Sequence, residues 1–213
     1  MKTLLAIPMK APARAKTRLA PAMDDSQRAQ LAVRLFERTL AFFRRNWPDF
    51  DVVAVTDDAT QIAPLAARHG AGVLLEVCEA GLSAAASLAL QHAWTGGYER
   101  LVIVPGDVPV WLRAEVRQML SLSQRHGLTL AESHDGGTNF LALAPPQRFT
   151  FHYGPQSAAL HARSGQECGL SVARCQLPFL ARDIDTAEDC LVLAHARRCR
   201  RGPRLSAFNG APP

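Results

Sequence analysis

Three aspartates in this chain follow apolar segments and could together hold a divalent cation. Asp107 comes after LVIV in the segment PGDVP, and Asp183 and Asp185 belong to RDIDT. Side chains alternate faces in an extended segment, so this pair is expected to share a face while Ile184 points into the core. Like charges on one face repel each other unless a cation lies near them. The carboxylates therefore predict a magnesium site, although a solvated PGDVP turn and an Asp185 that caps the final helix with Thr186 are open alternatives.

The loop after the first apolar segment carries clustered positive charge. Two of the chain's three lysines lie in IPMKAPARAKTRL, whose basic residues are Lys10, Arg14, Lys16 and Arg18. Prolines at positions 8 and 12 disfavour helix there and are expected to hold the segment open. Such a loop suits a triphosphate, whose negative charge the cations would balance. A surface loop with scattered charge is the alternative interpretation.

Two glycine-containing segments are candidate anion sites. GTN at 137–139 and GPQS at 154–157 each offer glycine N–H groups and hydroxyls. Pro155 fits the first turn of a helix, which would place Gly154, Gln156 and Ser157 at a helix N-terminus able to bind a carboxylate or phosphate. Capping alone would also explain these residues. In GLSAAASLA, small residues would let a helix end approach a bound base or ribose, and ordinary helix packing explains them nearly as well.

Short apolar runs alternate with longer helical patterns in the first half of the chain. The runs predict strands at 3–8, 51–56, 72–76 and 100–104. Four helices are predicted. The first reaches about Arg45 and is capped by Asp24, Asp25 or Ser26, and the second runs through Ala67 and is closed by Gly70. The third covers 81–94 with Ser83 as a cap, and the fourth covers 113–125. This alternation predicts a single-domain, Rossmann-like three-layer α/β sandwich with a mainly parallel, mixed sheet.

The second half of the chain is more mixed. Strands are predicted at TLAE, FLALA and FTFHY (129–132, 140–144 and 149–153), a helix after Gly154, and a last helix from about Ala187. Antiparallel strands late in such a sheet suggest a nucleotide half joined to an acceptor half. Ligands of open α/β sheets bind beyond the carboxyl ends of the strands, where Asp107 and the basic loop are expected to lie.

Composition narrows the class of protein. The length of 213 residues fits one domain, predicted at 1–196, followed by a flexible tail at 197–213 with five arginines and no acid. MKTLLAIPMK lacks a signal-peptide cleavage site, and no apolar run approaches a membrane span. We expect no membrane and no nucleic acid among the partners, although the tail could touch RNA or anionic lipid. A homodimer is compatible with the sequence.

The cysteines form an odd set without a C-x-x-C pair. This spacing argues against a disulfide framework or a zinc site and favours free, half-buried thiols in a reducing cytoplasm. The five positions are Cys78, Cys168, Cys175, Cys190 and Cys199.

A series of segments resembles one known family. IPMKAPARAKTRLAP, TDD, GLSAA, PGDVP, GGTNFLAL, HYGPQSAALH and DIDTAEDC follow, in order, the signature of the CofC/FbiD family, the guanylyltransferases of coenzyme F420 biosynthesis. The similarity extends to about Cys190. It implies a MobA-like nucleotidyltransferase fold and a cytoplasmic protein. It also implies transfer of GMP from GTP to 2-phospho-L-lactate, phosphoenolpyruvate or 3-phospho-D-glycerate, with release of pyrophosphate. The product would pass to the next enzyme of the pathway.

The resemblance also implies roles for individual residues. Magnesium would be held by Asp107, Asp183 and Asp185, which with Lys16 form the catalytic group. The acceptor would be held by Thr138, Asn139, Gly154 and Ser157. The nucleotide would contact Lys10, Lys16, Arg18, Thr56, Gly81, Ser83 and Pro105. The chain departs from the family pattern at Gly106, where Ala is common, and at Ser83, where Asn is common.

The expected chemistry does not need a side-chain nucleophile, because the phosphate of the acceptor is already ionised. Magnesium and the lysines would reduce the repulsion between the two anions and align the attack. His152 and His161 lie in a candidate region, but a lone histidine is more often structural than catalytic. A molybdopterin or sugar-phosphate nucleotidyltransferase is the second interpretation, disfavoured by the proline- and lysine-containing loop. A non-catalytic nucleotide- or RNA-binding protein is the third.

Overall fold

The computed structural model describes residues 1–78 and 80–182. Its seven strands are β1 Thr3–Pro8, β2 Asp51–Thr56, β3 Gly72–Leu75, β4 Arg100–Ile103, β5 Leu128–Glu132, β6 Thr138–Leu143 and β7 Val172–Cys175. Its helices are α1 Asp25–Asn46, α2 Ile62–Arg68, α3 Leu82–Thr95, α4 Arg113–Leu122 and α5 Ser157–Glu167, with short 3-10 helices η1 Pro12–Arg14 and η2 Thr17–Leu19. The Asp183 and Asp185 pair, the predicted helix near Ala187 and the tail at 197–213 lie outside the described residues.

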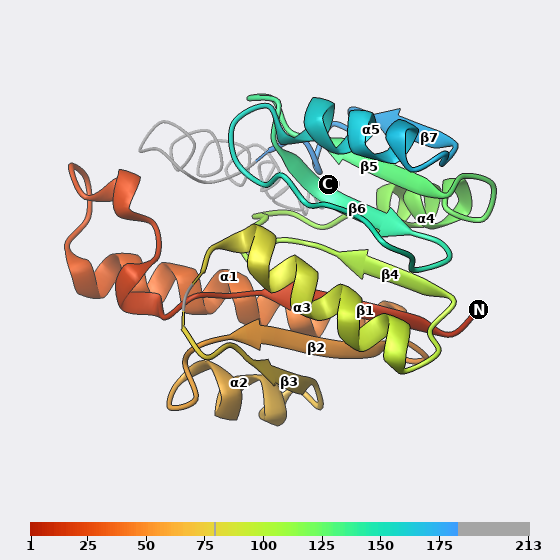
Figure 1. The fold of residues 1–213 in the computed structure, drawn as a ribbon. Coiled ribbons are helices and arrows are strands. Elements are labelled where there is room, and N and C mark those ends of the chain that lie inside the picture. The colour runs from red at the N-terminus through yellow and green to blue at the C-terminus, as the bar shows by residue number, and fades with distance from the viewer. Residues whose placement is uncertain (79, 183–213) are drawn as a thin grey trace, which may run out of the picture.

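The strands form one sheet in the order β3-β2-β1-β4-β6-β5-β7 (Figure 1). β1 pairs in parallel with β2 and β4, β2 with β3, and β5 with β7. β6 lies between β4 and β5 and is antiparallel to both. The prediction of a mainly parallel, mixed sheet with a late antiparallel insertion is therefore confirmed. The carboxyl ends of β1 to β4 meet at one edge of the sheet.

Helices cover both faces of the sheet, so the predicted three layers are confirmed. Along β1, Leu5 and Ile7 pack in one core with Phe36 of α1 and residues of α2 and α4. Leu4 and Ala6 point to the other face and pack in a second core with Ala86 of α3. This division follows from the alternation of side chains along a strand. None of the helices in the described part of the chain is long and apolar enough to cross a membrane.

The start of α1 agrees with the sequence, whereas the start of α3 does not. Asp24 accepts a hydrogen bond from the Gln27 N–H, and the Gln27 side chain accepts one from the Asp24 N–H, which completes a capping box. α3 instead begins after Gly81, whose φ of 86° favours glycine. Ser83 lies inside the helix and makes no capping bond, so its prediction as a cap was wrong.

The predicted strand at 149–153 and the predicted position of Pro155 were also wrong. Phe149 and Phe151 are buried in the second core, but the N–H groups of His152 and Tyr153 bond to side chains and not to a neighbouring strand. Pro155 lies in a turn, because Gln156 adopts a left-handed conformation (φ 57°) and α5 begins at Ser157.

The predictions of an open basic loop and of half-buried cysteines were also wrong in part. The basic loop is not fully open, since Pro12 begins the 3-10 helix η1. Cys78, Cys168 and Cys175 are free thiols as predicted, but the first two are exposed and not half-buried.

Candidate active site

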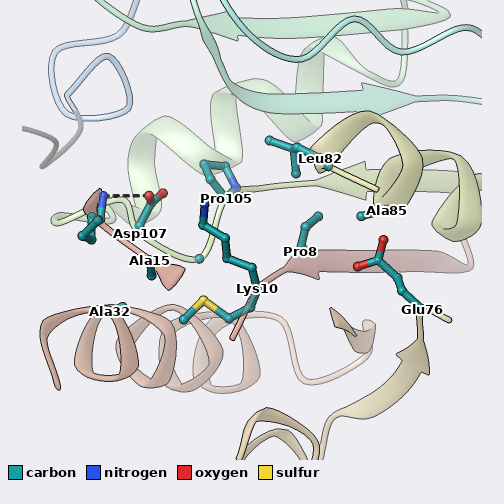
Figure 2. A pocket seen from close by; sticks show the side chains of 13 residues that line it. Pro8, Lys10, Ala15, Ala32, Glu76, Leu82, Ala85, Pro105 and Asp107 are labelled. Carbon is teal, nitrogen blue, oxygen red and sulfur yellow. Dashed lines mark hydrogen bonds and ion pairs between the residues drawn. The ribbon is translucent and has the colours of Figure 1, made fainter. Parts of the chain in front are cut away.

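A cavity of about 290 Å³ lies at the carboxyl edge of the sheet. It is formed by the loop after β1, the loop after β4, the end of β3 and the first turn of α3 (Figure 2). The side chains and backbone that line it come from Pro8, Met9, Lys10, Ala15, Lys16, Ala32, Glu76, Gly81, Leu82, Ala85, Pro105, Gly106 and Asp107. The structure therefore brings together five predicted site residues: Lys10, Lys16, Gly81, Pro105 and Asp107.

An ion pair between Lys16 and Asp107 lies at one end of this cavity (Figure 2). Lys16 Nζ donates to Asp107 Oδ2 at 2.7 Å, across 91 positions of sequence. The Lys16 side chain is only 3% exposed, whereas that of Asp107 is 37% exposed. Lys16 also has a positive φ of 55°, a conformation that a non-glycine residue adopts only when its surroundings impose it. The loop after β1 thus holds a buried ammonium against a carboxylate that remains open to the cavity.

The N-terminus of α3 forms another wall of the cavity. Gly81, Leu82 and Ala85 line it, and the absence of large side chains at positions 84–86 lets the helix pack closely. The first turn of a helix has N–H groups without intrahelical partners, and these groups can bind polar or anionic parts of a ligand. The Ser83 side chain does not line the cavity, and its Oγ accepts the Tyr153 N–H at 2.9 Å.

Glu76 lines the cavity, although no motif in the sequence indicates it. It follows β3 and its N–H donates to Thr56 O at 2.9 Å, so its backbone is fixed at the sheet edge. Its carboxylate and Asp107 lie at opposite ends of the cavity in Figure 2. One signal could have identified it, namely that it follows β3 as Asp107 follows β4.

Three predicted nucleotide contacts do not line the cavity: Ser83, Thr56 and Arg18. The Thr56 side chain is fully buried, and its Oγ1 accepts the Asp58 N–H at 3.0 Å. Arg18 is exposed on η2 and lies near the turn before β6. The pKa of Asp135 in that turn is lowered by its hydrogen bond from Ser133 first, by the Gly137 N–H, and to a smaller extent by the positive charge of Arg18. The roles of Thr56 and Arg18 toward a nucleotide stay predictions.

Predicted acceptor residues gather between β6 and α5. Thr138 Oγ1 lies 3.0 Å from Ser157 Oγ and 3.1 Å from His161 Nδ1, and all three side chains are buried. Gly154, with a φ of 134°, is exposed in the turn that precedes α5. This cluster is connected to the first cavity by the bond from the Tyr153 N–H to Ser83. The predicted roles of Thr138, Gly154 and Ser157 stay predictions, but the three residues do lie on facing elements.

Asn139 has a structural bond that the sequence did not suggest. Its side chain is buried and donates to Leu180 O at 2.8 Å. The carboxylate of Glu115 on α4 accepts the N–H groups of Phe179 and Leu180, at 3.1 and 2.9 Å. Together these two side chains hold the segment that leads to Asp183. A direct contact of Asn139 with the acceptor stays a prediction.

Asp107 is the one predicted metal ligand that lies within the described residues. Its carboxylate oxygen atoms are the hard donors that Mg²⁺ prefers, and its partial exposure leaves it accessible from the cavity. Within residues 1–78 and 80–182, no group of three or more His, Cys, Asp or Glu side chains is placed to hold a metal ion. Asp107 therefore fits as one ligand, and the other two predicted ligands, Asp183 and Asp185, lie outside the described residues.

Gly106, where the resemblance to the family predicts Ala, is closely packed. A Cβ added there would lie 3.0 Å from Cδ2 of Phe36, a fully buried ring, and 3.5 Å from Cγ2 of Ile7. An alanine at this position would therefore require Phe36 to move by a few tenths of an ångström.

Solved structures with the same architecture include a putative nucleotide-diphospho-sugar transferase from Desulfovibrio desulfuricans G20. It is 19% identical, with a TM-score of 0.76 over 98% of this chain and 90% of that one. A 4-diphosphocytidyl-2C-methyl-D-erythritol synthase from Anaerococcus prevotii has a TM-score of 0.61 at 13% identity, over 93% of this chain and 99% of that one. At these identities the likeness shows the fold alone, an α/β nucleotidyltransferase fold.

Sequence relatives cover nearly the whole chain. A 3-phospho-D-glycerate guanylyltransferase from Colwellia psychrerythraea is 34% identical over 91% of this chain and 92% of its own length. A 2-phospho-L-lactate guanylyltransferase from Methanothermobacter thermautotrophicus is 30% identical over 89% of this chain and 82% of its own length. The family described as "Guanylyl transferase CofC like" matches residues 2–198. With a nucleotidyltransferase fold and relatives of this kind over most of its length, the chain belongs to the CofC-like guanylyl transferase family.

Proposed function

We propose that this enzyme transfers GMP from GTP to the phosphate of a phosphorylated three-carbon acid and releases pyrophosphate, as a step of coenzyme F420 biosynthesis. The observation that carries the proposal is the Lys16–Asp107 pair, which borders one cavity with Lys10 and the N-terminus of α3. Membership of the CofC-like family supports GTP as the donor. The names of relatives that act on 3-phospho-D-glycerate, phosphoenolpyruvate and 2-phospho-L-lactate support the class of acceptor.

In the proposed complex, the phosphates of GTP lie at the Lys10 and Lys16 end of the cavity and guanine lies at the Glu76 end. The lysines supply positive charge for the triphosphate, and Lys16 is held in place by Asp107. Guanine presents two neighbouring donors, its N1–H and its 2-amino group, and a carboxylate can accept both. Adenine presents no such pair. Glu76 would therefore favour binding of guanine over adenine in this cavity.

The reaction joins a phosphate oxygen of the acceptor to the α-phosphorus of GTP and breaks the bond from that phosphorus to pyrophosphate. The acceptor oxygen is already anionic, so the residues of this chain need to orient and neutralise charge but not remove a proton. Lys16 is suited to neutralise charge at the α-phosphate because its ammonium is buried and fixed. Magnesium, with Asp107, Asp183 and Asp185 as its proposed ligands, would screen the repulsion between the two anions.

Thr138, Gly154 and Ser157 are proposed to hold the acceptor, which approaches from the β6–α5 side. The three acceptors differ by a methyl, methylene or hydroxymethyl group, and the experiment must separate them. Passage of the product to the next pathway enzyme, the cytoplasmic location and a homodimeric state remain predictions.

The proposal is tested by incubating the purified full-length protein with GTP, magnesium and each acceptor separately. Pyrophosphate release gives the rate, and mass spectrometry identifies the guanylylated acid. We expect turnover with GTP and with one acceptor above the others, and loss of turnover in a Lys16→Met variant that remains folded. Turnover with CTP or ATP but not with GTP would contradict the guanine assignment.

A further inference from the structure

His161 is a buried imidazole that the mechanism above does not use. It lies on α5, is 0% exposed, and both of its ring nitrogens have partners. Nδ1 lies 3.1 Å from Thr138 Oγ1, and Nε2 accepts the backbone N–H of His152 at 2.9 Å. These two bonds place the ring between the turn before α5 and the hydroxyl pair formed by Thr138 and Ser157.

The bond from His152 determines the tautomer of this ring. A backbone N–H can only donate, so Nε2 must be the unprotonated nitrogen, and a neutral imidazole then carries its proton on Nδ1. Burial, with a smaller effect from the neighbouring His152, lowers the pKa of His161 from 6.5 to about 4, so the ring is neutral at physiological pH. Nδ1–H therefore donates to Thr138 Oγ1.

The tautomer decides how many protons the hydroxyl pair can offer to a ligand. Thr138 and Ser157 have one hydroxyl proton each, and their mutual hydrogen bond at 3.0 Å uses one of them. Because the imidazole already donates to Thr138, the second proton cannot go to the ring and remains available for another acceptor. With the opposite tautomer, Thr138 would donate to the ring and Ser157 to Thr138, and both protons would be used.

We propose that His161 is a positioning residue, which makes the Thr138–Ser157 pair a hydrogen-bond donor toward an anionic oxygen of the acceptor substrate. This inference rests on the proposed function, since it assigns the pair to the acceptor side of the reaction. With the opposite tautomer of His161, the hydroxyl pair would present only a lone pair to the anion and would repel it. The ring thus selects anionic acceptors without touching them.

Two substitutions separate the hydrogen-bonding role of His161 from its packing role. In His161→Asn the amide N–H can take the place of Nδ1 and still donate to Thr138. In His161→Gln the longer side chain can place its carbonyl oxygen near Nε2, which keeps the bond from His152 but loses the donor to Thr138. We expect His161→Gln to raise the KM for the acceptor about tenfold or more and His161→Asn to raise it less than about threefold. The KM for GTP should change in neither.

The kinetic measurement varies the acceptor at saturating GTP, after thermal melting has shown that both variants are folded. Equal effects of the two substitutions on the KM of the acceptor, or an equal rise in the KM of GTP, would overturn the inference. The tautomer is measured separately, by long-range proton–nitrogen NMR of the wild-type protein labelled at its histidines. A protonated Nδ1 in His161 is expected, and a protonated Nε2 would overturn the inference whatever the activity. A protein with the expected tautomer but without guanylyltransferase activity would instead refute the proposed function.

Discussion

Replacing Asp107 by Asn removes the partner of a buried ammonium while keeping the size of the side chain. Loss of one partner from a fully buried ion pair costs about 3–5 kcal/mol, because the remaining charge is left uncompensated. Here the Lys16 side chain is 3% exposed but that of Asp107 is 37% exposed, so water screens part of the effect. We therefore expect the free energy of unfolding to fall by only about 1–2 kcal/mol.

The same substitution should have a larger effect on catalysis. It removes a carboxylate from the proposed metal site and releases Lys16 from its fixed position. Loss of one such electrostatic contact in an active site typically lowers kcat by about 10²–10³-fold, and we expect a loss of that order. The variant should remain folded at the assay temperature, so the two effects can be measured separately.

The assay combines urea unfolding with steady-state kinetics for Asp107→Asn, Lys16→Met and the double variant. Because the two side chains contact each other, the double variant should be less destabilised than the sum of the single variants. Glu167→Gln is the matched control, since it removes a carboxylate from an exposed ion pair with Arg163 on α5, and it should leave kcat unchanged. A wild-type kcat in Asp107→Asn, or strict additivity of the stability changes, would refute the reasoning.

Two further predictions concern base selection and pH. Glu76→Gln should raise the KM for GTP about tenfold and reduce the preference for GTP over ITP, which lacks the 2-amino group; an unchanged GTP/ITP ratio of kcat/KM would remove Glu76 from base recognition. The pKa of His161 is lowered from 6.5 to about 4, so the unfolded chain binds more protons between these values, and stability should fall as the pH drops through this window. At most, protonation of His161 should lower the free energy of unfolding by about 3 kcal/mol. Urea unfolding of the wild type and of His161→Asn at several pH values measures this effect. If the free energy of unfolding depends on pH with the same slope in both proteins, His161 is not a neutral buried ring.

The sequence was informative where one local pattern decides the structure. Residues 4–8 of TLLAIP are all apolar because β1 is buried on both faces, and Asp24 with Gln27 is a capping box that can be recognised without any tertiary contact. The residues after β1 and β4 could be placed at one edge because parallel strands end together. That is why Lys16 and Asp107 were both predicted for one site although 91 positions separate them.

The failures occurred where distant side chains decide the structure. FTFHY has the composition of a strand, but its final N–H groups bond to His161 and to Ser83, and the latter is 70 residues away. A lone glutamate has no pattern that identifies it. Glu76 and Glu115 were therefore missed, although one lines the cavity and the other holds the chain ahead of Asp183.

Ser83 shows how the two halves of the proposed site depend on each other. The resemblance to the family predicts Asn at this position, and the serine found there suggested a lost contact with base or ribose. In the structure its Oγ accepts the Tyr153 N–H at 2.9 Å, and Tyr153 immediately precedes Gly154 in the proposed acceptor turn. The carbonyl oxygen of an Asn side chain could accept the same N–H, so both residue types can perform this role. One hydrogen bond thus joins the end of α3 that is proposed to bind the nucleotide to the proposed acceptor turn.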